Sequence, residues 1–171
     1  MIIYRFDSDT DTICKALPIL NDVPAAFVRD ITQIGCPGLL QPTQQEKALV
    51  EEQLEKVWQL IGDTMAEYPF PVVGVYLYDD LQAADEYYMT VGMCNQQAGM
   101  DKASSRALIG IGRSAVKRGD DYLAFVLLHE MAHAATSVNH DDRFRQYLDY
   151  LIMSYNREYG TEIENDYQRD D

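Results

Sequence analysis

The fold is decided by the stretch Tyr122-Leu-Ala-Phe-Val-Leu-Leu-His-Glu-Met-Ala-His-Ala-Ala135. Its residues are apolar or small on nearly every side of a helix, which predicts that this helix is deeply buried. The stretch contains the motif His129-Glu130-Met131-Ala132-His133, with histidines at positions i and i+4. Residues with this spacing stack on one face of an α-helix, so both imidazoles can reach the same point. We therefore expect a domain built around one buried helix that carries two convergent histidines.

The same motif predicts a zinc site. A catalytic zinc ion takes three protein ligands and keeps a fourth position for water. Glu130 is rotated by about 100° from His129 on the helix, so it can stand beside the metal, where a general base would act on the water. The only other histidine of the chain, His140, follows just beyond the end of this helix. Burial of these polar groups is costly without a partner, which favours a metal site over the alternative of hydrogen-bonded core histidines beside a surface glutamate.

The composition predicts one acidic domain in the cytoplasm. The 14 basic and 28 acidic residues give a net charge of −14, with a sequence pI near 4.4. Such a chain repels phosphate groups, which argues against nucleic acid or an anionic membrane surface as its main partner. Residues 1–171 fit a single domain; they contain no run of 18 apolar residues and no signal peptide pattern at the start. The cysteines, at positions 14, 36 and 94, form no CxxC pair and indicate reduced thiols.

Residues 1–70 are expected to be mainly helical. A short strand is predicted at 2–6 and a short helix at 24–34. Thr43-Gln-Gln-Glu46 is a capping box, in which each side chain satisfies an amide at the start of a helix. Apolar residues then recur at helical spacing to about Met65, before two prolines end the pattern.

The period of the pattern changes after residue 71. Three strands rich in β-branched and aromatic residues are predicted at 72–78, 87–93 and 107–112. The polar, glycine-bearing segment from Asn95 to Ser105 is expected to be a loop. The motif helix follows, with Asp120 or Asp121 as its N-cap.

A closing helix is predicted from about Asp142 to Tyr159, and residues 160–171 form an acidic tail. The helix is expected to bury Phe144, Tyr147, Leu148, Leu151, Ile152 and Tyr155. The order of elements predicts an α+β fold, in which a small, mostly antiparallel sheet packs on the motif helix between N-terminal and C-terminal helices.

The segment from Ala107 to Phe144 resembles the catalytic segment of SprT-like zinc metallopeptidases. That family shows an apolar strand, a short linker, an HExxH helix, and a later histidine followed by a bulky aromatic residue. The corresponding stretches are Leu108-Ile-Gly-Ile111, Leu127-Leu-His-Glu-Met-Ala-His133-Ala, and His140-Asp-Asp-Arg-Phe144. The resemblance covers roughly a quarter of the chain. It implies a minimal zincin-like domain, with His129, His133 and His140 as zinc ligands and Glu130 as the catalytic base.

The chain also departs from this family. Members often have a glycine after the third histidine, where this chain has Asp141, and many carry a downstream cysteine zinc ribbon, which is absent from this sequence. Members that act on DNA-bound substrates carry DNA-binding elements, to which a charge of −14 is poorly suited. The metzincin pattern fits less well, because six residues separate His133 from His140 and none is glycine. A gluzincin would take its third ligand from a glutamate on a later helix, for which Glu158 and Glu162 are candidates.

These observations predict a zinc-dependent metallopeptidase that acts on a peptide or protein substrate. Zinc held by imidazoles lowers the pKa of water from 15.7 towards about 7. Glu130 would accept the proton and pass it to the leaving amine. The strand at 107–112 could hold an extended substrate, with Gly110 and Gly112 allowing close approach of a backbone; simple packing against the helix is the alternative.

The residues that assist this chemistry stay open. Arg143, Arg145 or one of the tyrosines could stabilise the oxyanion, and Asp141, Asp142 or Asp149 could orient the histidines. The favoured interpretation of each of these aspartates is a helix cap or a solvated surface charge. Two other functions remain as alternatives. One is a non-catalytic or regulatory zinc protein, in which the metal joins the last two helices and a partner binds the surface. The other is a structural domain without metal.

Overall fold

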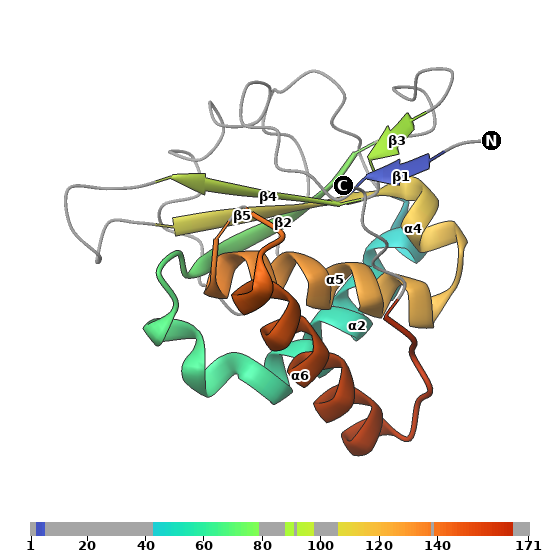
Figure 1. Cartoon of the computed structure of the whole chain (residues 1–171). Coiled ribbons are helices and arrows are strands. Elements are labelled where there is room, and N and C mark those ends of the chain that lie inside the picture. The colour runs from blue at the N-terminus through green and yellow to red at the C-terminus, as the bar shows by residue number, and fades with distance from the viewer. Residues whose placement is uncertain are drawn as a thin grey trace.

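The site is positioned by a small sheet and three long helices (Figure 1). The computed structural model describes residues 3–5, 43–78, 88–90, 92–97, 106–137 and 139–165. In chain order the elements are β1 (Ile3–Arg5), α2 (Gln44–Ile61), the 3-10 helix η2 (Gly62–Glu67), β2 (Val72–Tyr78), β3 (Tyr88–Thr90), β4 (Gly92–Gln97), β5 (Arg106–Gly112), α4 (Arg113–Lys117), α5 (Asp120–Ala135) and α6 (Asp142–Tyr159). The fold is α+β. The helix predicted at 24–34 lies outside the described residues.

The sheet places the apolar strand β5 in the middle, in the order β2-β5-β4. β2 runs parallel to β5, with Val75 opposite Ile109, whereas β4 runs antiparallel to β5, with Cys94 opposite the same residue. β1 and β3 form a separate parallel pair. The expectation of a mostly antiparallel sheet is therefore wrong, and the described pairing is mixed. The reason is that β5 is a nearly continuous buried apolar strand, which takes a partner along each edge.

The strand predicted at 87–93 is divided into two. β3 ends at Thr90, and β4 begins at Gly92 and continues to Gln97. The residues from Asn95 to Gln97, which were expected in a loop, pair with the first residues of β5. Backbone hydrogen bonds to β5 thus extend the strand beyond the point where the apolar pattern ends.

The capping box at the start of α2 is confirmed. Thr43 Oγ1 accepts from the amide of Glu46 at 3.1 Å, and Glu46 Oε1 accepts from the amide of Thr43 at 3.0 Å. Arg113, the first residue of α4, donates to both oxygens of the same carboxylate, at 2.7 and 3.1 Å. Burial alone would raise the pKa of Glu46, but the hydrogen bonds from Arg113 and Thr43 outweigh it, so the pKa lies below its usual value. One carboxylate therefore caps α2 and joins it to α4.

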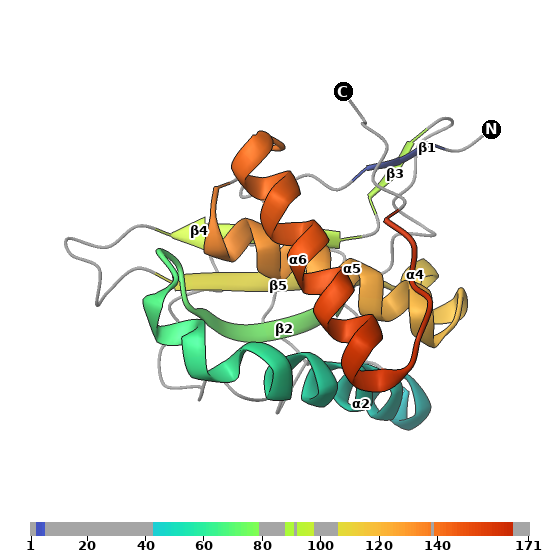
Figure 2. The same cartoon turned by 60° about the horizontal axis from the view of Figure 1, so that its bottom comes forward.

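The motif helix α5 lies against one face of the sheet, with α2 and α6 packed on it (Figure 2). Every residue from Leu123 to Ala135 is buried, as the apolar sequence predicts. The expected caps are wrong: the N-cap is Gly119, with a φ of 109°, which a glycine adopts at little cost. Asp120 and Asp121 lie in the first turn, where their charges favour the helix dipole.

The closing helix α6 has the predicted bounds. Asp141 is its N-cap, and the carboxylate accepts from the amide of Phe144 at 3.0 Å. Gly160 ends the helix in the left-handed conformation, with a φ of 65°. Of the residues predicted to be buried, all are buried except Tyr147, which is half-buried. Among the described residues, no helix is both long enough and apolar enough to span a membrane.

Candidate metal centre

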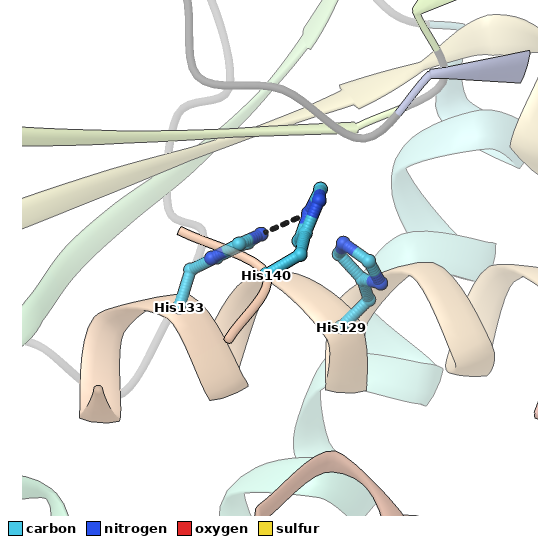
Figure 3. Close-up of side chains that lie close together, drawn as sticks. All are labelled: His129, His133 and His140. Carbon is cyan, nitrogen blue, oxygen red and sulfur yellow. Dashed lines mark hydrogen bonds between the residues drawn. The ribbon is translucent and has the colours of Figure 1, made fainter. Parts of the chain in front are cut away.

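His129 and His133 project from the same face of α5, one turn apart (Figure 3). Their ring centroids lie 5.0 Å apart, and the exposed fractions of the two side chains are 0% and 1%. The apolar surroundings of α5 remove both imidazoles from water. Two dry nitrogen donors on one helix face are what the i, i+4 spacing predicts.

His140 is brought to the same point by the connection between α5 and α6. Thr136 ends α5 with its hydroxyl and amide both bonded to the carbonyl of Ala132, and the chain then returns to the N-cap of α6 at Asp141. Nε2 of His140 lies 3.0 Å from Nε2 of His133, and the ring centroids of His140 and His129 lie 5.4 Å apart. The structure thus brings together all three histidines singled out in the sequence.

A backbone carbonyl orients the ring of His133. Its Nδ1 lies 2.7 Å from the carbonyl oxygen of Ser137. A carbonyl can only accept, so Nδ1 carries the hydrogen, and in the neutral ring Nε2 presents its lone pair towards His140. Metal-binding histidines are held in this way, with the second ring nitrogen donating to a carbonyl or carboxylate.

Phe144 forms an aromatic floor beneath the three histidines. Its ring stacks on His133 with centroids 4.2 Å apart and an interplanar angle of 19°. The centroids of His129 and His140 lie 4.9 and 5.0 Å from the same ring. Phe144 is fully buried, so it keeps water from one side of the cluster and limits the rotation of all three imidazoles.

The three histidines could hold a metal ion. One ring nitrogen from each can be chosen such that all three atoms lie within 4.8 Å of one another. Two nitrogens at 2.0–2.1 Å from a tetrahedral zinc ion lie about 3.3 Å apart. This distance is longer than the 3.0 Å between the Nε2 atoms of His133 and His140 and shorter than the 4.8 Å limit for the whole group. Small ring rotations are therefore sufficient to fit such an ion. Together with the carbonyl-oriented tautomer of His133, the donor set matches a nitrogen-ligated divalent metal.

Glu130 is fully buried beside this cluster, but it is not one of the three grouped donors. Its carboxylate reaches across to β4, where it lies against Gly92. Glu130 therefore lies outside the three-histidine group, with its carboxylate against the first residue of β4.

The alternative third ligands lie elsewhere. Glu158 and Glu162 are both exposed, and Glu158, near the end of α6, lines a groove that contains none of the three histidines. Among the oxyanion candidates, Arg143 lines the same groove, and Arg145 pairs with Asp142 at 3.7 Å on the exposed side of α6.

The aspartates near the site have structural contacts. Asp141 caps α6, Asp142 pairs with an arginine one turn later, and Asp149 accepts from the side-chain amide of Asn165 at 2.8 Å. The orienting partner of His133 is instead the carbonyl of Ser137. Sequence reasoning missed this contact because every residue has a carbonyl, and no residue type signals where it points.

A concave region lies between η2 and α6, and we call it the tyrosine groove. Its volume is about 760 Å³. The hydroxyls of Tyr68 and Tyr147 hydrogen-bond to each other at its edge, and Tyr150 lies beside them. Burial raises the pKa of both Tyr68 and Tyr147 above the usual value. The remaining lining residues are Leu60, Ile61, Thr64, Glu67, Ala135, Thr136, Arg143, Gln146, Ser154, Arg157 and Glu158.

No protein-family model, curated protein or solved structure matches this chain. The function is therefore inferred from the chemistry of the histidine cluster and its surroundings.

Proposed function

We propose that this protein is a zinc-dependent metallopeptidase of the SprT-like, minimal zincin type. The observation that carries the proposal is the convergence of three imidazoles, two of them on α5, the helix that also carries the buried Glu130. A structural zinc site closes its coordination with four protein ligands, whereas a catalytic site has three and keeps an open position. Within the described residues the group contains three donors, which favours the catalytic kind. We propose a cytoplasmic protein, because the three cysteines of the sequence are widely spaced and form no CxxC pair.

The chain's own residues divide the work of hydrolysis. His129, His133 and His140 would hold the zinc ion, with the Ser137 carbonyl fixing the tautomer of His133. When bound, zinc supplies Lewis acidity, which acidifies water and polarises a peptide carbonyl. Glu130 would accept the proton as the water attacks and then deliver it to the leaving amine. The side chain of Glu130 is fully buried, so bulk water is kept from its carboxylate.

The structure changes the expectation about substrate binding. β5 has a partner strand along each edge, so it cannot add a substrate strand as the sequence suggested. β4 pairs with β5 along one edge, and within the described part of the chain no strand pairs with its other edge. β4 also packs on α5. We propose that an extended peptide binds along β4 through main-chain hydrogen bonds, which gives affinity with little sequence preference.

Glu130→Gln tests the proposal. The amide keeps the size of the side chain but cannot accept the proton, so the rate of casein cleavage should fall by about 10²–10⁴-fold. Bound zinc, measured on the purified protein, should stay at about one per chain in this variant and should be lost in His133→Ala. Glu158→Gln, the same change at an exposed glutamate of the tyrosine groove, is the matched control and should cleave like the wild type. Equal cleavage by Glu130→Gln and the wild type would exclude Glu130 as the base.

A non-catalytic zinc protein is the second candidate. It is favoured by the position of His140, which directly precedes the N-cap of α6, and by the bond from His133 to the connection before it. A metal ion on these residues would clamp α5 to α6. Wild-type protein that binds zinc, gains stability from it and cleaves no substrate would support this second function.

A further inference from the structure

Gly92, the first residue of β4, meets α5 at the general base. It is buried and pairs with Ile111 of β5. A Cβ atom built on Gly92 would lie 2.8 Å from Oε2 of Glu130 and 3.3 Å from its Cδ. It would also lie 2.7 Å from Cγ1 of Val126, one helical turn earlier. The backbone of β4 therefore lies directly against the carboxylate of Glu130.

A glycine is required at position 92 because there is no room for a Cβ atom, and not because of the backbone conformation. The described glycines with a positive φ are Gly119 and Gly160, and Gly92 is not among them. Other residues could adopt its backbone angles, but real Cβ atoms essentially never approach a heavy atom closer than 3.0 Å. A side chain at residue 92 would therefore have to push β4 away from α5 or turn the Glu130 carboxylate aside.

We propose that Gly92 is a positioning residue for the general base. Its bare α-carbon lets β4 close over α5, and the strand then limits where the carboxylate of Glu130, the residue after the proposed ligand His129, can lie. The inference rests on the proposed function, since it assigns Glu130 the role of base. β4 would then have two roles, because it would bind the substrate peptide and also position the carboxylate of Glu130.

Gly92→Ala should therefore separate catalysis from binding. The added methyl points from β4 towards α5 and leaves the outer edge of the strand unchanged. We expect kcat to fall by on the order of 10²-fold, because small displacements of a catalytic group have effects of this size, whereas KM and zinc content stay near the wild-type values. Gly62→Ala is the matched control. A Cβ there would also be crowded, at 2.8 Å from Nε1 of Trp58, but far along the chain from the site, so this variant should lose thermal stability and keep its kcat.

A second measurement tests the contact without relying on activity. Val126→Ala removes the Cγ1 atom that would also crowd a Cβ atom at residue 92. In this background the Glu130 carboxylate is the remaining close neighbour, and adding Gly92→Ala should lower the Tm by about 3 °C or more. In Val126→Ala/Glu130→Ala protein the carboxylate is also absent, so the same change should lower the Tm by distinctly less. The difference between the two losses measures the coupling of residue 92 to Glu130.

The outcomes separate this inference from the proposed function. An active Gly92→Ala enzyme with wild-type kcat, or equal Tm losses in the two backgrounds, would overturn the role of Gly92 and leave the peptidase proposal intact. A wild type with bound zinc and no cleavage would refute the proposed function, and the catalytic role of Gly92 with it. The Tm comparison would then still decide whether the carboxylate and β4 are in contact.

Discussion

The histidine cluster and the tyrosine groove are two polar regions that differ in their exposure to solvent. His129 and His133 are 0% and 1% exposed, whereas Tyr150, in the groove, is 60% exposed. The groove has an open space of about 760 Å³. The cluster has nitrogen donors that converge within 4.8 Å and an aromatic floor beneath them.

We infer from this difference that the region with the open volume and the region suited to bind a metal are separate. Charges and dipoles act strongly where water is excluded, because no solvent screens them. The hydroxyls of the groove hydrogen-bond to each other beside solvent, so they stabilise the junction of η2 and α6. In the cluster, His129 and His133 are buried and a backbone carbonyl orients the ring of His133, an arrangement that favours metal binding. We therefore expect metal affinity and activity to depend on the cluster and to be insensitive to the groove.

The largest expected effect is on metal affinity, and its absence would contradict the distinction between the histidine cluster and the tyrosine groove. His140→Ala removes one of the three proposed ligands, so zinc affinity should fall by more than about 100-fold, since even the loss of an outer partner costs about 10–100-fold. Competition with a chromophoric chelator measures this change. Zinc at about 1,000 times the dissociation constant should stabilise the wild type by about 4 kcal/mol and should have little effect on the variant. Unchanged affinity would remove His140 from the ligand set.

The next effect concerns the floor of the cluster. Phe144→Ala should lower the free energy of unfolding by about 3–5 kcal/mol, because it leaves a cavity among buried rings. Urea unfolding of the metal-free protein measures the loss. Phe144→Leu, which restores most of the apolar volume, should recover most of the stability. A loss below about 1 kcal/mol for the alanine variant would contradict the buried packing of this ring.

The smallest effect is expected in the tyrosine groove. Tyr68→Phe removes one hydroxyl of the Tyr68–Tyr147 pair, which should cost about 1 kcal/mol of stability and leave zinc affinity and cleavage unchanged at neutral pH. A loss of activity comparable with that of a cluster variant would show that the groove belongs to the site.

The pH dependence of stability provides a further check on the groove. Burial raises the folded-state pKa of Tyr68 and Tyr147 above the ordinary tyrosine value of 10.0. The folded protein thus keeps these protons when the unfolded chain loses them. Their contribution to stability is complete below pH 10 and is lost as the pH rises above it. Alkaline unfolding of Tyr68→Phe should accordingly be less steep than that of the wild type.

Much of the fold could be predicted where local patterns dominate. The bounds of β2 and α6 and the capping box of α2 follow from side-chain periodicity and from turn chemistry. The mixed sheet could not be predicted in the same way, because strand order and direction depend on contacts between distant segments. For the same reason the residues of β4 after Cys94 were mistaken for a loop: their polar side chains hide a backbone ladder that only β5 completes.

The sequence by itself determined which side chains could converge to hold a metal ion. Two histidines at i and i+4 on an apolar helix share one face. The third histidine follows His133 by 7 residues, so the short connection keeps it close to the other two. Only the tertiary structure decided how these groups are held. The Ser137 carbonyl that orients His133, the Phe144 ring beneath the cluster and the glycine that presses β4 against Glu130 are all contacts across space. Such contacts depend on how the helices and strands pack in the whole core. Helical periodicity, in contrast, is a local pattern that can be recognised in one segment of the sequence.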